Sequence, residues 1–508
     1  MMQLSIPVFL PLILGFVLLV FRPKAHVAKA LAFFSSFAVL FESIRLALRV
    51  RSTGAAISEI YEWLPAIGLQ YHVGVDGITS IFLLLTGFVF SMGVFASLPN
   101  ADARYFGFVL LLQSGLVGTF IAQNFLHFFL FWELALIPAF FLVRLYGGSK
   151  APAASIQFFL YTMFGSVAML VGFLALYLAT GTFDLSELAA ARPPGGYGAL
   201  LAQRLRWSGL EPQTIGTIIF LLAFLGVAVK VPLFPFHSWL PAAYTQAPTP
   251  VTMLLTGVMS KMGVYALIRL ILPIFPEQIQ RLHQPLLALA VITILYGALA
   301  AFAQRDIKFL FAYSSLSHLG YCFLGVFAAA KAGVPGLENE RAAAINGVLL
   351  QGLSHGIIAA ALFAFVSFLE RRSGGGRAIE SFGGLRKVNP VFAGLMGIAL
   401  FSSLGLPGLS GFPAEFLIFK GTFSLAPVAS VFAVLGLLLT ALYLLTFYGR
   451  VFLGPLNTNR AAATDLTGEE KLVVIPAIVI TFILGIAPQL ILTICNSAVT
   501  ALVQRLKF

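Results

Sequence analysis

The chain has 508 residues, of which 59% are hydrophobic and only 10% are charged. Soluble proteins carry about 25% charged residues, so this set is too small to cover a water-facing surface, and a soluble globular domain is excluded. The sequence instead predicts a protein whose outer solvent is lipid. The formal net charge of +12 comes from Lys and Arg that lie mostly between apolar runs, where they set topology and contact headgroups. No basic cluster with interleaved aromatics occurs in the sequence, so we expect no nucleic-acid partner.

Fourteen stretches of the chain are apolar enough to cross a membrane, since a span needs about 20 mainly apolar residues. The sequence therefore predicts an all-α, polytopic transmembrane bundle of about 14 helices. The loops at 51–76 and 181–212 are polar, and neither is long enough to separate two domains. The excess of Lys and Arg at 371–387 favours an orientation with the N-terminus outside. In chain order, the stretches are 3–21, 27–48, 77–97, 106–122, 124–146, 156–180, 213–236, 246–272, 284–304, 306–331, 341–370, 390–423, 426–455 and 470–500.

Helix-breaking residues interrupt two of these stretches. Pro232 and Pro235 lie inside the seventh, and Pro407 and Gly408 lie inside the twelfth. Freed backbone groups survive at membrane depth only where they are buried in protein or line a wet cavity. Two broken helices five spans apart predict an internal repeat of two five-helix units, the second inverted because five is an odd number. The predicted parts are N-terminal helices (1–105), a first unit (106–272), an inverted second unit (284–455) and a C-terminal helix (456–508).

Ionisable residues inside a span are costly, so each is a candidate functional residue. Glu133 lies near the middle of the fifth stretch among apolar neighbours, and Lys230 stands at the break of the seventh. An ion pair between them would explain both charges. The alternatives are a carboxylate that only holds helices together and a lysine that snorkels from a helix end. Lys261, at the centre of the eighth stretch, is too deep to snorkel and is a candidate proton carrier because burial disfavours its charged form.

Two histidines extend this set into the second predicted unit. His318 shares one helix face with Ser314 and Tyr321, and His355 follows Gln351 by four residues. These polar stripes favour a proton relay over the alternative, which is a pair of hydrogen-bonded core residues.

Glu415 lies just past the break of the twelfth stretch, at the position that corresponds to Lys230 in the first unit. The alternative is a carboxylate that faces the aqueous side. The set contains titratable groups but no nucleophile–base pair, which favours proton hopping over covalent chemistry. No CxxC, metal-ligand spacing or nucleotide-binding fingerprint occurs, so we expect no metal and no cofactor in this chain. The candidate site residues are Glu133, Lys230, Lys261, His318, His355 and Glu415.

Several stretches of the chain carry a resemblance to one family. They resemble the antiporter-like membrane subunits of respiratory NADH-quinone oxidoreductase (complex I), which are related to Mrp-type sodium/proton antiporters. The resemblance covers most of residues 70–455 and implies fourteen helices with two inverted five-helix units. The matching stretches are residues 133–148, 230–269, 303–321, 383–385 and 410–416.

The resemblance also implies roles for the candidate residues. In this family a glutamate of the fifth helix pairs with a lysine of the broken helix, and these positions match Glu133 and Lys230. A central lysine matches Lys261. The residue at the exit of the second unit is a lysine in the L-like and N-like subunits and a glutamate in a third type, as in Glu415 here. The histidines of the second unit match His318 and His355.

The resemblance implies that electron transfer from NADH to quinone, in partner subunits, drives proton pumping through this chain. FMN, iron–sulfur clusters and quinone would lie in those partners. L-like and N-like antiporter subunits would lie on either side, in a bacterial inner (plasma) membrane. The alternatives are an Mrp-like sodium/proton antiporter subunit, a membrane subunit of a related hydrogenase or ferredoxin-linked complex, and a scaffold without transport.

One segment departs from the family pattern, which usually reads WLPDAH followed by an acidic residue and Ala-Pro. Here Ala242, Tyr244 and Gln246 stand where an Asp, a His and an acidic residue are usual. Neutral groups thus replace titratable ones near the expected proton entrance. The sequence therefore does not identify the residues through which protons would enter.

Overall fold

The computed structural model describes residues 3–64, 69–191, 196–205, 209–331, 336–458 and 464–506. In this part of the chain, eleven helices are long and apolar enough to cross a membrane, or twelve if one bent pair near the C-terminus counts as a single span. The predicted polytopic helical bundle is therefore confirmed, but the count of fourteen is not. Two of the predicted spans are apolar helices that are too short by this measure, Ile6–Phe21 and Pro390–Ser403.

The N-terminal part of the chain forms helices and a β-hairpin. The prediction of an all-α chain is wrong here, because a stretch with alternating apolar residues, at Tyr71, Val73 and Val75, pairs as a strand with residues 57–64. The two strands pair antiparallel, with Ile60 opposite His72. The backbone amide of Leu4 donates to the Glu59 carboxylate at 3.1 Å and fastens the N-terminus to the hairpin. The elements are α1 (Ile6–Phe21), α2 (Ala25–Thr53), β1 (Ile57–Leu64), β2 (Leu69–Val75) and α3 (Gly77–Phe95).

The middle of the chain forms a second group of helices. Several start at a residue whose side chain accepts a hydrogen bond from a free amide of the first turn, as Asp102 does for α4 and Asn124 for α5. The elements are α4 (Ala103–Ile121), α5 (Phe125–Tyr146), α6 (Ala151–Thr180), α7 (Leu185–Ala191), α8 (Gly196–Arg204), α9 (Pro212–Lys230), α10 (Trp239–Gln246), α11 (Thr249–Leu254), the π-helical turn η3 (Leu255–Met259), α12 (Lys261–Ala266), the π-helical turn η4 (Leu267–Ile271) and α13 (Leu272–Ile274).

The remainder of the chain is again helical. Asp306 caps the start of α16 through two backbone amides, and Thr467 and Glu470 form a reciprocal capping box at the start of α21. The elements are α14 (Pro276–Arg281), α15 (His283–Phe302), α16 (Ile307–Ala329), α17 (Glu338–Arg372), the 3-10 turns η5 (Ile379–Ser381) and η6 (Leu385–Lys387), α18 (Pro390–Ser403), α19 (Gly411–Leu425), α20 (Pro427–Phe452), α21 (Gly468–Ile486) and α22 (Gln489–Arg505).

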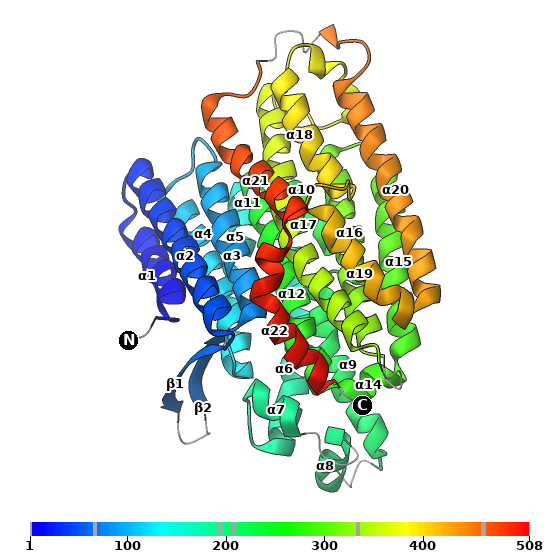
Figure 1. Cartoon of the computed structure of the whole chain (residues 1–508). Coiled ribbons are helices and arrows are strands. Elements are labelled where there is room, and N and C mark those ends of the chain that lie inside the picture. The colour runs from blue at the N-terminus through cyan, green and yellow to red at the C-terminus, as the bar shows by residue number, and fades with distance from the viewer. Residues whose placement is uncertain are drawn as a thin grey trace.

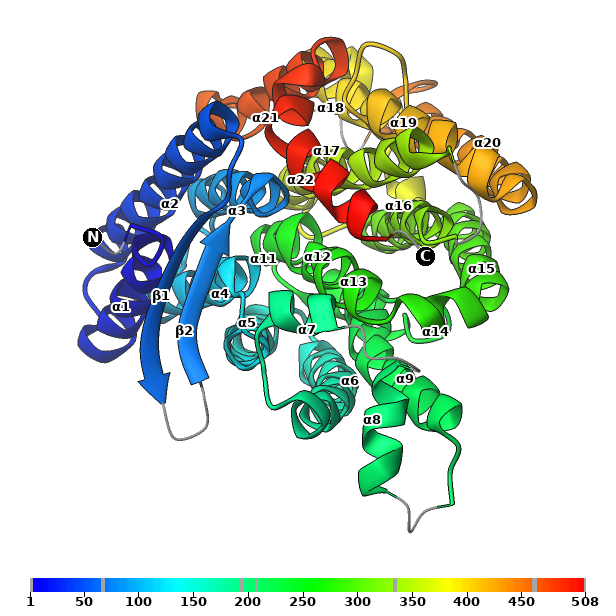
Figure 2. The same cartoon turned by 60° about the horizontal axis from the view of Figure 1, so that its bottom comes forward.

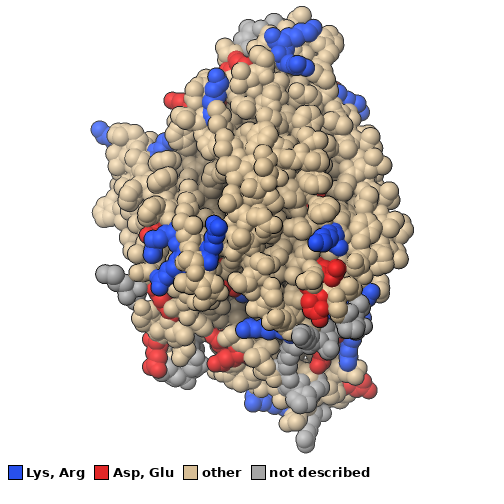
Figure 3. Space-filling view, viewed as in Figure 1, with Lys and Arg blue, Asp and Glu red and all other residues tan. Residues whose placement is uncertain are grey.

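The helices form a bundle with distinct inner and outer members. The β-hairpin, α7 and α8 lie at one end of it, which we call the hairpin end, and the start of α18 lies at the opposite end (Figure 1). Seen from the hairpin end, α16, α17 and α11 to α13 are surrounded by α1, α2, α6, α15 and α20 (Figure 2). Figure 3 shows charged side chains gathered towards the two ends, with a belt between them that is nearly free of charge, as a lipid-facing surface requires.

Glycine allows α19 to lie close against the buried helix α17. A Cβ added at Gly347 would lie 2.5 Å from the backbone nitrogen of Ile418, and one added at Gly421 would clash with the carbonyl oxygen of Glu340. Small residues at such crossings let two membrane helices approach backbone to backbone. The close approach brings Glu415, on α19, to the buried core.

Candidate functional site

Both predicted helix interruptions are confirmed. α9 ends at Lys230, and helical structure resumes only at Trp239. α18 ends at Ser403, and α19 begins at Gly411. Lys230 is therefore the last helical residue before the first break, and Glu415 lies in the first turns after the second. Each break places one ionisable side chain beside irregular backbone inside the bundle.

Lys261 lies at the centre of the bundle, between two π-helical turns. Its side chain is fully buried. The Nζ atom donates to the carbonyl oxygen of Thr256 at 2.5 Å and to Oγ of Ser260 at 3.3 Å, and it lies 2.9 Å from Nδ1 of His355. The π-helical turn η3 ends two residues before Lys261, and such wide turns are frequent at functional sites.

A continuous file of polar groups leads from Lys261 to Glu415. The rings of His355 and His318 lie 5.2 Å apart between their centroids. Nδ1 of His318 lies 3.5 Å from a carboxylate oxygen of Glu415, and its Nε2 lies 3.2 Å from Oγ of Ser403, at the end of α18. All four titratable side chains are at most 6% exposed. The structure thus brings four of the six predicted site residues into one connected group.

Glu133 and Lys230 form a second, separate part of the site. The two charges interact electrostatically, but neither carboxylate oxygen of Glu133 and no Nζ proton of Lys230 has a hydrogen-bond partner. Lys230 Nζ lies instead 5.0 Å from the ring centroid of Trp132, the neighbour of Glu133 on α5. The structure therefore shows no direct ion pair between these two residues, and the lysine packs over the Trp132 ring instead. α9 and α12 touch near Gly263, which places this pair one helix away from Lys261.

Ser314, His318 and Tyr321 of α16 were predicted to share one helix face, but they do not all contact the group that joins Lys261 to Glu415. Ser314 shares a hydrogen bond of 2.8 Å with the hydroxyl of Tyr443, and Tyr321 donates to the carbonyl oxygen of Ala433 at 3.3 Å. Both contacts lead towards α20 and away from the histidines. Of the three residues predicted to share one face, only His318 belongs to the connected group.

Tyr244, one of the departures from the family pattern, lies beside Lys261. It is 1% exposed, and its hydroxyl faces Ser260 and Thr256, the two residues that bind Nζ of Lys261. The neutral segment 242–246 therefore still supplies a polar group next to the central lysine. Gln246, at the end of α10, accepts instead from the backbone amide of Lys150 at 3.1 Å.

A second, partly buried cluster, which the sequence prediction missed, lies towards the hairpin end. Asp76 pairs with Arg269, and Thr79 accepts from the Arg269 guanidinium at 3.2 Å. The hydroxyl of Tyr265 donates to the carbonyl oxygen of Phe120 at 2.5 Å. Lys261, Tyr265 and Arg269 follow one another at intervals of four residues, a spacing that could have indicated a shared helix face.

Three aromatic rings separate this cluster from the central lysine. Phe82, Phe120 and Tyr265 pack together with ring centroids 5.2 to 5.3 Å apart, and all three are at most 1% exposed. Phe82 also reaches Gly352, one turn before His355 on α17. We call these three residues the aromatic triad. An apolar layer thus lies between the central Lys261–His355 pair and the hairpin end.

A third cluster, also missed, lies towards the opposite end. Lys308 is 3% exposed, its Nζ lies 3.3 Å from a carboxylate oxygen of Glu370, and it donates to the carbonyl oxygen of Ala247 at 3.0 Å. Arg377 pairs with Asp306, the cap of α16, at 3.0 Å. These residues connect the starts of α11 and α16 to the end of α17. Lys308 lies in the first turn of its helix, where a lysine is common, so the sequence gives no signal that its side chain is buried.

At the hairpin end, His72 of β2 fastens the loop after α6. Its Nδ1 lies 2.6 Å from a carboxylate oxygen of Asp184. Burial alone would raise the pKa of Asp184, but the hydrogen bonds from His72, Ser186 and Glu187 outweigh it and hold that pKa at about 2. Asp184 is therefore ionised at neutral pH and ties the hairpin to the start of α7.

Among the described residues, no three His, Cys, Asp or Glu side chains gather in a way that could hold a metal ion. Long apolar helices that enclose buried titratable side chains are the architecture of a multi-pass membrane protein, in which such side chains are candidate functional groups. The sequence profile of the family described as NADH:quinone oxidoreductase/Mrp antiporter, TM, matches residues 122–440. The chain belongs to this family.

Curated relatives and solved structures match nearly the whole chain. NADH-quinone oxidoreductase subunit M of Rickettsia prowazekii (strain Madrid E) is 35% identical over 98% of this chain and 97% of its own length. F(420)H(2) dehydrogenase subunit M of Methanosarcina mazei is 35% identical, over 97% of each chain. A chain of respiratory complex I from Thermus thermophilus with bound NADH superposes with a TM-score of 0.86 at 29% identity, covering 100% of both chains. This chain is therefore similar to M-type subunits along its full length.

Proposed function

We propose that this chain is the proton-translocating membrane subunit of a respiratory NADH-quinone oxidoreductase in a bacterial plasma membrane. NADH would be oxidised and quinone reduced in partner subunits, which would carry the FMN, the iron–sulfur clusters and the quinone site. L-like and N-like antiporter subunits would flank this chain. The observation that carries the proposal is the row of neighbouring titratable side chains from Lys261 through His355 and His318 to Glu415.

Each member of the file can hold or pass a proton. An ammonium donates to a neutral imidazole, and an imidazole has two nitrogens with which it can accept on one side and donate on the other. The two imidazole rings are neighbours, with centroids 5.2 Å apart, but they share no direct hydrogen bond, so transfer between them would use a bridging water. A proton that leaves Lys261 can therefore pass to His355, then to His318, and finally to the carboxylate of Glu415.

The Glu133–Lys230 pair would regulate proton binding at Lys261. Its two charges are buried and lack hydrogen bonds, so a small movement changes their separation and the field at Lys261. The energy required is moderate, since one charge moved across 100 mV is worth about 2.3 kcal/mol. We infer that a partner subunit shifts this pair, and that Lys261 then binds or releases its proton.

The two broken helices would be equivalent positions of two inverted units, 106–272 and 284–455. The support for this is that each break adjoins one ionisable residue, Lys230 in the first and Glu415 in the second. At a midplane site, broken helices present free backbone groups to the transported ion.

The test is the substitution Lys261→Ala in the intact assembly, with Lys150→Ala, in the exposed loop after α5, as the matched control. We expect assembly to persist while proton pumping and NADH-driven quinone reduction both fall by about a hundredfold or more, the usual loss for a residue that transfers protons. Unchanged pumping in the Lys261→Ala assembly would overturn the proposal. The control variant should pump normally, because its ammonium lies outside the file.

The relative from Methanosarcina mazei favours one alternative, in which the electron donor is not NADH. That protein carries the name of an F(420)H(2) dehydrogenase subunit and is as similar to this chain as the Rickettsia relative is. The subunits that co-purify with this chain decide between the two donors. Sodium-dependent proton flux in membranes that lack those subunits would instead identify an antiporter.

A further inference from the structure

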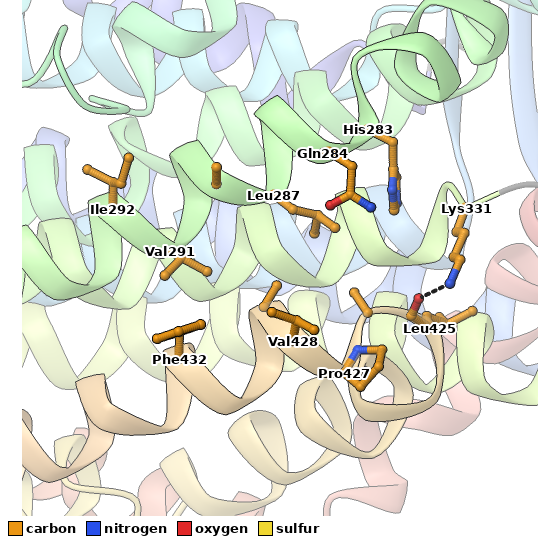
Figure 4. A pocket seen from close by; sticks show the side chains of 13 residues that line it. His283, Gln284, Leu287, Val291, Ile292, Lys331, Leu425, Pro427, Val428 and Phe432 are labelled. Atoms are coloured by element: carbon orange, nitrogen blue, oxygen red, sulfur yellow. Dashed lines mark hydrogen bonds between the residues drawn. The ribbon is translucent and has the colours of Figure 1, made fainter.

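An open groove lies on the outside of the bundle, between α15 and α20. It encloses about 540 Å³. Its walls are apolar: Leu287, Val291 and Ile292 come from α15, and Val428 and Phe432 come from α20 (Figure 4). Three of these side chains are strongly exposed, with Val428 at 70%, Phe432 at 51% and Ile292 at 43%. The groove therefore opens to the medium that surrounds the helices, which for a membrane span is lipid.

Polar groups gather at one end of this groove. His283, Gln284 and Lys331 lie together where α15 and α20 begin and α16 has just ended (Figure 4). Lys331 donates one hydrogen bond to the carbonyl oxygen of Leu425 at 2.8 Å, which leaves two of its three N–H groups for other partners. Lys331 is the one charged residue among those that line the groove. The polar end therefore carries a net positive charge at the boundary of the membrane.

The dimensions of the groove match one leaflet of a bilayer. From His283 to Ile292 the helix rises by about 14 Å, at 1.5 Å per residue. Half of the hydrocarbon core is about 15 Å thick. A molecule whose charged head lies at Lys331 can therefore extend an acyl chain along α15 to the level of Ile292 without leaving its own leaflet.

We propose that this groove is a binding site for an acidic phospholipid, with the phosphodiester at Lys331 and Gln284 and one acyl chain between α15 and α20. The positive end selects an anionic headgroup, and the exposed apolar walls are covered by the chain. The site lies on the far side of α16 from the Lys261 file, and it is independent of the proposed proton path. A bound lipid there would hold α15 and α20 at a fixed separation.

The test uses the full chain, purified in mild detergent and examined by native mass spectrometry. Phosphatidylglycerol and phosphatidylcholine with the same acyl chains are added separately. We expect phosphatidylglycerol to be retained about fivefold more, the factor that one lysine contributes near an anionic headgroup. Equal retention of the two lipids by the unmodified chain would overturn the proposal without any need for a variant.

Two variants separate the headgroup from the acyl chain. Lys331→Gln should abolish the preference for phosphatidylglycerol, whereas Lys150→Gln, outside the groove, should keep it. Val291→Trp, which fills the groove, should lower the retention of both lipids. A preference that survives Lys331→Gln would show that the anionic lipid binds elsewhere and would refute the assignment.

A cysteine probe decides whether a partner chain covers the groove in the assembly. Ile292→Cys is labelled with a lipid-soluble maleimide in the intact assembly; the two native cysteines, Cys322 and Cys495, are both buried. We expect labelling after delipidation and protection when phosphatidylglycerol is returned. A cysteine that stays unreactive in both conditions would show that a protein partner occupies the groove, contrary to the proposal.

Discussion

Nζ of Lys261 lies 2.9 Å from Nδ1 of His355, where α12 and α17 meet in the middle of the bundle. At this distance the pair can share one positive charge but cannot hold two, because an imidazolium would present a second donor to the ammonium. In the proposed function, the two residues would therefore act as one proton-binding unit, and a proton that arrives from either side would displace the one that is already there.

Replacement of the acceptor should interrupt this unit. We expect His355→Leu to reduce proton pumping by about a hundredfold or more, as for other losses of a proton-transfer group, because Lys261 then loses the imidazole that lies 2.9 Å from its Nζ atom. His355→Gln should have an intermediate effect, since its amide oxygen accepts a hydrogen bond but takes up no proton. Pumping is measured with a pH-sensitive dye in membrane vesicles, and His26→Leu, at an exposed position, serves as the control.

The end of the file can be tested with a substitution of equal shape. Glu415→Gln keeps an acceptor for His318 but cannot be charged, so we expect slower proton pumping and, because the side chain is buried, a destabilisation of about 1 to 3 kcal/mol. The comparison of pumping rate with melting temperature checks both parts. Normal pumping by this variant would mean that protons leave the file before they reach α19.

The aromatic triad should act as a seal between Lys261 and the hairpin end. We expect Phe82→Ala to remove part of this apolar layer and to raise the passive proton leak of proteoliposomes, because the deleted ring leaves a cavity between Lys261 and the hairpin end. Combining it with Lys261→Ala should remove the added leak if protons pass through the lysine. A leak that is equal in the single and double variants would place the opened path elsewhere.

The hairpin end should depend on pH through Asp184. Its folded pKa of about 2 is lower than the ordinary 3.8, so the carboxylate stabilises the folded state above about pH 4 and loses this contribution as the pH falls towards 2. The full loss, reached below both pKa values, amounts to about 2 kcal/mol, and part of it is already lost at pH 3. The protection factors of the α7 amides at pH 6 and pH 3, which correct for the pH dependence of intrinsic exchange, measure it, and Asp184→Asn should show similar protection at both values.

The crossing of α17 and α19 should not tolerate a methyl group. Gly347→Ala would place a Cβ 2.5 Å from the backbone of Ile418, and we expect a destabilisation of about 1 to 3 kcal/mol together with displacement of Glu415. Gly394→Ala is the matched control, because a Cβ at this glycine on α18 meets no atom within 4 Å. Similar melting temperatures for both variants would show that α19 can move away without loss.

The sequence predicted the helices and their breaks because apolar length and proline positions are local signals. It identified the members of the central file because a buried charge is rare enough to be informative one residue at a time, as Lys261 shows. It missed the hairpin, where a short alternating pattern competed with a polar loop. It also missed Arg269 and Lys308, which lie near helix ends where a cation is ordinary. Their burial and their partners depend on how distant helices pack.

The two π-helical turns that flank Lys261 have a mechanical consequence. Each turn holds one residue more than an ordinary turn, and this extra residue can pass along the helix by exchange of one backbone hydrogen bond for another. When it passes a position, the side chain there swings by about 100° around the axis. α12 can therefore redirect the lysine from one set of neighbours to another by rotation alone, while the helix ends stay anchored in the surrounding bundle.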